Sequence, residues 1–189
     1  MEPRGERRYE GWTRRRTVAG AGAAVLAAGF GALRAVQPAG AQIIRTGGGI
    51  AGGGQIKEKG NRTHFSVFAS RFDEDGLPGP VFVGLFQWVD GKADVSIVST
   101  KIESYGPIEG GSENDRELLG IAKLNGEDGH PFRVVMADEG GPGSAKDTIE
   151  VSVGKVGAKD ATTDPVYKLG GILDVGDLEL LTFKFTPPA

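Results

Sequence analysis

Apolar and polar residues alternate along most of the chain after residue 60, with the two-residue period of a half-buried β-strand. The stretch "NRTHFSVFASRF" places Phe65, Val67 and Ala69 on one face of the expected strand. Its other face carries His64, Ser66, Phe68, Ser70 and Phe72. The run "VFVGLFQWV" is apolar on both faces, as in a central or barrel-closing strand, and "DTIEVSVGK" alternates strictly.

Turn-forming residues separate these stretches. The segments "DEDGLPGP", "VDGK", "NGEDGH" and "DEGGPG" supply Asp, Asn, Gly or Pro where the backbone must reverse. We expect a turn at Asp128–Gly129 between "ELLGIAKLNG" and "PFRVVMAD", although "NDRELLGIAKL" is also compatible with a short helix. The pattern predicts an all-β fold, a single antiparallel β-barrel or sandwich of about eight strands.

Residues 42–54 are rich in glycine and predict a linker or a first edge strand, followed by a single β domain over residues 55–189. The segment contains a literal G-x-G-x-x-G at residues 47–52. A dinucleotide site requires a strand before this motif and a helix after it, and the motif here leads into a strand pattern instead. The sequence therefore predicts no bound cofactor.

Residues 1–41 have the pattern of a cleavable export signal. Paired Arg15 and Arg16 precede an uncharged run over residues 18–33, and Ala39 and Ala41 occupy the −3 and −1 positions of a small-residue cleavage site. The alternative is a retained membrane anchor, but a spanning helix needs roughly 20 strongly apolar residues. We expect export by the twin-arginine route to the periplasm, cell wall or exterior of a bacterium, with no membrane span in the mature protein.

Removing residues 1–41 takes away seven arginines and three glutamates, so the formal net charge changes from −3 to −7. The mature chain of 148 residues is one domain by length and has no cysteine for disulfides, thiol chemistry or zinc. An acidic chain without basic clusters argues against nucleic acid as a partner. An envelope or extracellular protein or a polysaccharide is the expected kind of partner.

The order of "GGGQI", "THFSVFASRF", "FRVVMADEGGPGSAKDTIEV" and "LGGILDVGDLELLTF" resembles the post-COAP type of small exported bacterial β domain. The resemblance covers most of residues 47–185 and rests on turn and strand patterns. It implies an exported β domain and carries no assigned activity. The closing stretch "LELLTFKF" departs from the more polar last strand of that type.

No set of residues predicts catalysis. His64 and His130 have no activated nucleophile beside them and are expected at the surface or on a barrel wall, His130 in the "GEDGHPF" turn. Metal ligands are limited mainly to oxygen, which favours calcium, and the weak candidates are Asp73, Asp75 and Asp138. These acids lack the remaining ligands of a calcium loop, so we expect solvated turn acids and no metal site.

The segment "ADEGGPGSAKDTIEV" is expected to be a hairpin connection with a strand on each side. A phosphate cradle would need a helix N-terminus, which the flanking patterns do not provide. Its expected structural residues are Asp138, Gly140, Gly141, Pro142, Gly143 and Asp147. The two aspartates lie at the ends of the loop, where a carboxylate can accept loop N–H groups.

Trp88 and Tyr105 are the candidates for facing a ligand, although aromatic residues on strands more often belong to the core. The expected function is that of an exported non-catalytic barrel or sandwich module with a binding or structural role. The alternative is a small barrel enzyme, such as an isomerase or cyclase, or a small-ligand carrier with an interior pocket. An enzyme would need convergent ionisable groups inside, whereas a filled interior indicates a module.

Overall fold

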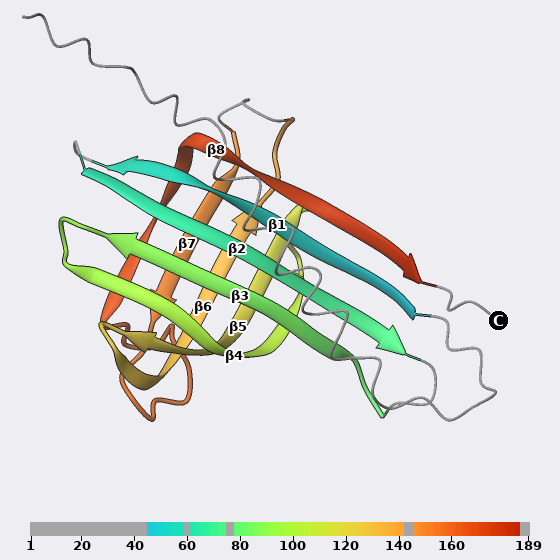
Figure 1. Ribbon diagram of the computed structural model, residues 1–189, viewed down its shortest axis with the longest axis horizontal. Coiled ribbons are helices and arrows are strands. Elements are labelled where there is room, and N and C mark those ends of the chain that lie inside the picture. Colours follow the sequence, from blue (N-terminus) through green and yellow to red (C-terminus); the bar gives the residue numbers. More distant parts are fainter. Residues whose placement is uncertain (1–44, 59–60, 75–77, 142–145, 186–189) are drawn as a thin grey trace, which may run out of the picture. The chain divides into compact units, whose positions relative to one another are not determined.

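Eight antiparallel strands form a closed barrel in the computed structural model, which describes residues 45–58, 61–74, 78–141 and 146–185 (Figure 1). The strands are β1 (Arg45–Glu58), β2 (Asn61–Glu74), β3 (Val81–Asp90), β4 (Val95–Pro107), β5 (Asp115–Leu124), β6 (Glu127–Ala137), β7 (Thr148–Val153) and β8 (Tyr167–Phe185). Each strand pairs with the next in the chain, and β8 pairs with β1 to close the barrel. The expected all-β fold is confirmed, as a barrel.

The glycine-rich segment belongs to the barrel wall from Arg45 onward. Residues 45–54 lie in β1, which pairs with β2 on one side and with β8 on the other. This part of the expected linker or edge strand is therefore an interior strand of the sheet. "NDRELLGIAKL" is likewise not a helix, because residues 115–124 form β5 between β4 and β6.

The turn between β5 and β6 lies three residues earlier than expected. Asn125 and Gly126 have φ values of 51° and 90°, the left-handed conformation that a two-residue hairpin requires. Asp128 and Gly129 belong to β6, where Gly129 also has a φ of 90° close to a shift in the β5–β6 register. The hairpin turn is therefore Asn125–Gly126.

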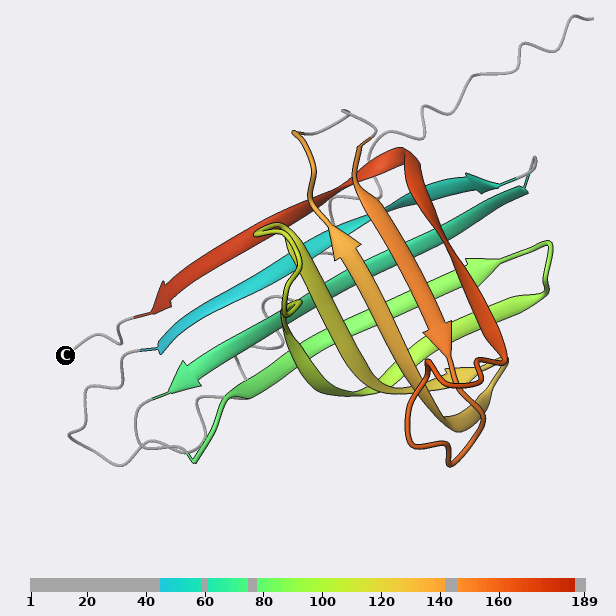
Figure 2. The same cartoon turned by 180° about the vertical axis from the view of Figure 1, so that it is seen from behind.

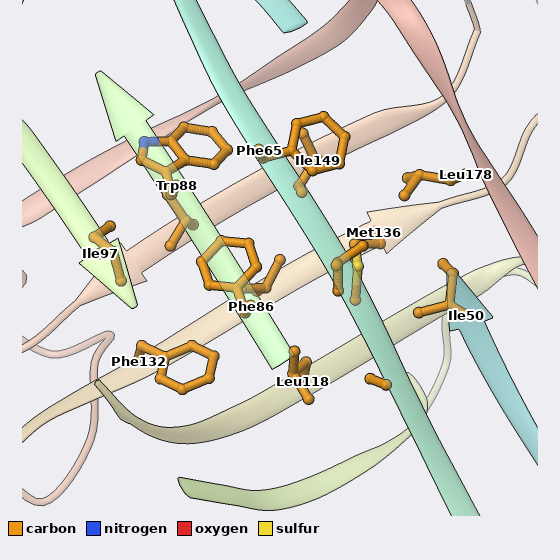
Figure 3. Close-up of a cluster of buried hydrophobic side chains, with 14 of the residues drawn as sticks. Ile50, Phe65, Phe86, Trp88, Ile97, Leu118, Phe132, Met136, Ile149 and Leu178 are labelled. Atoms are coloured by element: carbon orange, nitrogen blue, oxygen red, sulfur yellow. The ribbon is translucent and has the colours of Figure 1, made fainter. Parts of the chain in front are cut away.

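Inward-facing side chains fill the barrel (Figure 3). Phe86 and Trp88 from β3 lie beside Phe65 of β2, and Phe86 stacks on Phe132 of β6 with 5.7 Å between ring centroids. Aliphatic side chains from the other strands occupy the remaining space. The largest buried side chains are each at most 2% exposed: Trp88, Phe86, Phe132, Ile50, Ile56, Ile97, Leu118, Met136, Ile149, Leu173, Leu178 and Val134.

A bend in β8 allows one strand to pair with two partners. Residues 167–172 pair with β7, and residues 173–185 pair with β1, with a register shift opposite Gln55 and Ile56. Gly176 has a φ of 114° in the bend. On β1, Gly52 pairs with Leu178, and an added Cβ at Gly52 would lie 2.2 Å from the carbonyl oxygen of Asp177. Glycine on both strands thus permits the close approach.

Beyond the bend, β8 runs beside β1, and together with β2 and β3 it extends past the rest of the barrel (Figures 1 and 2). β3 pairs with β4 only over residues 87–90, so its first half forms one edge of this extension. The second half of β8 forms the other edge. The barrel therefore carries a four-stranded projection made of β8, β1, β2 and β3.

The close approach at Gly52 predicts a selective effect of a single methyl group. Gly52→Ala should lower the free energy of unfolding by about 1–3 kcal/mol or more, because the methyl group meets fixed backbone. Gly48→Ala is the control on the same strand, since its added Cβ comes no closer than 3.6 Å to the carbonyl oxygen of Leu181. Urea unfolding checks both variants, and equal losses would show that the bend does not need Gly52.

Candidate functional site

The two aromatic residues expected to face a ligand lie in the core. Trp88 is 0% exposed and Tyr105 is 3% exposed, and both belong to the hydrophobic cluster inside the barrel. Trp88 points into the same space as Phe65 and Phe86 (Figure 3). Their surroundings are packed apolar side chains, which is the core role that aromatic strand residues usually have.

A chain of hydrogen bonds joins Trp88 to the wall of the barrel. The indole Nε1 donates to the hydroxyl of Tyr167 at 2.9 Å, and that hydroxyl donates to Asp90 Oδ2 at 2.9 Å. Asp90 Oδ1 accepts the backbone N–H groups of Lys92 and Ala93 in the β3–β4 turn. The chain links β3 to the start of β8 and gives each buried polar atom in it a partner, as a structural network requires.

Tyr105 is unsuited to proton transfer near neutral pH. Burial raises the pKa of its hydroxyl from 10.0 to about 12, and the nearby charge and side chain of Arg116 offset only part of that rise. The hydroxyl oxygen has no partner with normal hydrogen-bond geometry. Arg116 instead donates to the carbonyl oxygens of Glu113 and Asp115, so its effect on Tyr105 is mainly electrostatic.

The histidines differ from each other in environment. His64 is exposed on β2, as expected for a surface residue. His130 lies in β6, not in a turn, and is 5% exposed. Its Nδ1 is 2.8 Å from the carbonyl oxygen of Gly154, while Nε2 is buried without a hydrogen-bond partner and 3.6 Å from Glu127. The turn expectation fails because the hairpin turn is at Asn125–Gly126, which places His130 inside the following strand.

The carboxylates at the ends of the β6–β7 loop hold the second half of β8. Asp147, 3% exposed, accepts the Glu139 N–H within the loop at 3.0 Å and the Leu178 N–H of β8 at 2.8 Å. Asp138 accepts the Leu180 N–H at 3.0 Å. Asp147 thus bonds both to its own loop and to β8, whereas Asp138 bonds to β8. Gly140 and Gly141 lie in the loop, and Pro142 and Gly143 fall outside the described residues.

Asp177, which lies next to these carboxylates, was not anticipated from the sequence. Its Oδ1 is buried without a hydrogen-bond partner. Burial raises the pKa of Asp177, and the charge of Asp147, a hydrogen bond with Asp147 and the charges of Asp138 and Glu179 raise it further. The neighbouring acids and the burial therefore favour the protonated form of Asp177. No local motif marks Asp177, because the β8 bend and a distant loop bring the acids together.

The calcium candidates do not form a common site among the residues with described positions. Asp73 pairs with Arg71 at 3.0 Å near the end of β2, while Asp138 bonds to β8. Asp75 lies outside the described residues. Across the described ranges, no three His, Cys, Asp or Glu side chains are grouped so that they could hold a metal ion.

Comparison with known proteins adds no relative: no family model, curated protein or solved structure matches the chain. In the described part of the chain, no helix has the length and apolarity that a membrane crossing requires. The polar groups show their roles through their own contacts. Those of Asp90, Tyr167, Asp138 and Asp147 tie turns and strands to one another.

The raised pKa of Asp177 predicts a pH-dependent loss of stability. An acid whose pKa is higher in the folded state binds its proton more tightly there, so stability falls as pH rises from the unfolded value through the folded value. Asp177→Asn should remove this fall and raise the unfolding midpoint at pH 7 relative to the parent. Asp174→Asn, at an exposed position of the same strand, is the control.

The measurement is urea unfolding of the parent and both variants at several pH values from acid to neutral. We expect Asp177→Asn to gain stability over the parent, measured as the free energy of unfolding, as the pH rises toward neutral. The stability of Asp174→Asn relative to the parent should not change with pH. A difference with no dependence on pH would show that Asp177 does not hold a proton more tightly in the folded protein.

Proposed function

We propose that the chain is an exported, non-catalytic β-barrel module with a binding or structural role outside the cytoplasm. The observation that carries this proposal is the filled interior of the barrel. Phe86, Trp88 and Phe132 occupy the space that a barrel enzyme or a carrier would need for its ligand. A module whose interior is occupied by its own side chains works through its surface.

The polar groups of the interior support the same conclusion. Catalysis would use convergent ionisable groups that face a substrate. In the interior, the Asp90 carboxylate instead accepts hydrogen bonds from two turn N–H groups and from the Tyr167 hydroxyl. The Tyr105 hydroxyl has a pKa of about 12 and is therefore protonated at neutral pH. These groups are committed to the fold.

Export is supported by the sequence of residues 1–41, which lie outside the described residues. Arg15 and Arg16 before a weakly apolar run, with small residues at Ala39 and Ala41, make a twin-arginine signal. The cleaved chain has no cysteine and a formal charge of −7. We infer an envelope or extracellular protein or polysaccharide as partner, and an acidic surface disfavours nucleic acid.

The test uses Trp88 as a reporter, because Trp12 leaves with the signal and Trp88 is then the single tryptophan. The protein is recovered after export, with an expected N-terminus at Gln42. Trp88 should resist quenching by acrylamide, and its emission should not change on addition of fatty acids, a retinoid or small oligosaccharides. The urea-unfolded protein, in which Trp88 is accessible, is the control for quenching.

A saturable change in Trp88 emission with one of these probes would contradict the proposal if it came with thermal stabilisation. A ligand at 100 times its dissociation constant adds about 2.7 kcal/mol to stability, which a melting experiment detects. Such a pair of results would identify a carrier or an enzyme with an interior site.

A further inference from the structure

The first half of β3 is an unpaired edge of the sheet. Residues 81–85, which we call the β3 edge, pair with β2 on one side, whereas β4 pairs with β3 only over residues 87–90. β4 bends away because the β4–β5 register shifts between Ser99 and Lys101, which makes Thr100 the extra residue of a β-bulge. The β3 edge accordingly lies at the margin of the projection in both views (Figures 1 and 2).

The backbone groups that point outward from the β3 edge belong to Phe82 and Gly84. Next to the paired residues, the Phe86 N–H donates to Ser99 Oγ at 2.8 Å, so it points away from β2. Alternate residues of a strand direct their backbone groups to the same side, so those of Phe82 and Gly84 also point away from β2. Val83 points the other way, since its carbonyl oxygen accepts a hydrogen bond from a β2 side chain at 3.3 Å.

The β3 edge lacks the protection that the other edge of the projection has. On β8, carboxylates accept the N–H groups of Leu178 and Leu180, and Lys184 is exposed farther along the strand. Occupied N–H groups and charged side chains are common means of preventing a sheet edge from pairing with another chain. Residues 81–85 carry no charge and are apolar on both faces of the sheet. The β3 edge can therefore accept a further strand.

The free groups of the β3 edge match those of a second β3 edge in the antiparallel direction. When Val83 lies opposite Val83 of a second copy, Phe82 lies opposite Gly84, and each such pair exchanges both of its N–H···O=C bonds. The next pair outward is Pro80 with Phe86, which has no free N–H group, because proline has none and the Phe86 N–H is already bonded to β4. The ladder is thus limited to the bonds that Phe82 and Gly84 can make.

The side chains fit the same register. Gly84 has no room for a side chain, because an added Cβ would lie 2.5 Å from the carbonyl oxygen of Phe68. The position leaves a gap on the inner face of the sheet, and Phe82 lies partly buried on that face. An aromatic ring opposite a glycine on a neighbouring strand covers this kind of gap. In the antiparallel register, each copy places Phe82 over Gly84 of the other.

We propose that the β3 edge pairs with the β3 edge of a second copy and so joins two barrels through one continuous sheet. The pairing is closed, because it uses the same edge of both copies, and it therefore ends at a dimer. A second copy sets Phe82 against Gly84 and leaves no donor unpaired opposite Pro80, which an unrelated strand would not do. An uncharged edge also suits chains that each have a formal charge of −7 after cleavage, since like charges oppose contact.

The experiment is amide hydrogen exchange of residues 42–189, which contain all eight strands. Because the paired stretch is short, the concentration should run from about 10 µM to about 1 mM. The Phe82 and Gly84 amides should exchange about tenfold or more slowly at the highest concentration, because the second copy covers them. The Val83 and Leu85 amides are the matched controls, since β2 pairs them in the single chain. Sedimentation velocity over the same range should show one chain converting to two.

A pair of variants separates the backbone bond from the side chain. Phe82→Pro removes an N–H group on the free side of the strand, where an edge strand tolerates proline. Phe82→Ala is its control, because both variants lose the ring and only the proline variant loses the N–H. Phe82→Pro should raise the dissociation constant by roughly 10- to 100-fold over that of Phe82→Ala, since the bond is lost from both copies. Circular dichroism checks that both variants keep the β fold.

A parent that sediments as one chain throughout the series overturns the proposal. So does a dimer whose Phe82 and Gly84 amides exchange as fast as in the single chain, a result that needs no variant to fold. A folded Phe82→Pro that dimerises as well as Phe82→Ala has the same consequence. If the two amides slow only when a short apolar peptide of unrelated sequence is added, the β3 edge belongs to a different partner and the proposal is wrong.

Discussion

The structure depends on a constraint in β8, which must turn away from β7 while keeping its backbone hydrogen-bonded. Beyond Ile172, β8 no longer pairs with β7, so the N–H groups of Leu178 and Leu180 have no strand partner on that side. The carboxylates of Asp147 and Asp138 replace those partners. Unpaired buried N–H groups cost about 1–3 kcal/mol each, so Asp138 and Asp147 complete the hydrogen bonding of this part of the barrel wall.

Two features of the molecule follow from the bend. It closes the barrel, because the same strand reaches both β7 and β1. It also carries β8 past the barrel beside β1, which produces the projection. Glycine at Gly52 and Gly176 lets the two backbones approach, and the filled core with Trp88 fixes the strands on which the projection rests. The closed barrel and the projection thus share one physical origin.

Much of the fold could be predicted from alternation and turn chemistry. Phe65, Val67 and Ala69 face the core as the two-residue period indicates, and Asp147 holds its loop. Predictions failed where partners from distant strands decide the outcome. The glycines of β1 resembled a linker, because the sequence does not show that the β8 backbone lies close beside them. Asp90 and Asp177 resembled ordinary strand-end acids, because Tyr167 and Asp147 reach them only in three dimensions.

Amide hydrogen exchange of Leu178 and Leu180 tests most directly whether carboxylates complete the β8 ladder. In the parent, both amides should exchange as slowly as amides that are hydrogen-bonded between paired strands. Asp147→Ala should accelerate exchange at Leu178 by roughly 10- to 100-fold, the loss of a charge-assisted hydrogen bond, with a smaller effect at Leu180. Asp138→Ala should do the reverse. Rapid exchange of both amides in the parent, or no change at Leu178 in Asp147→Ala, would contradict this account of the bend.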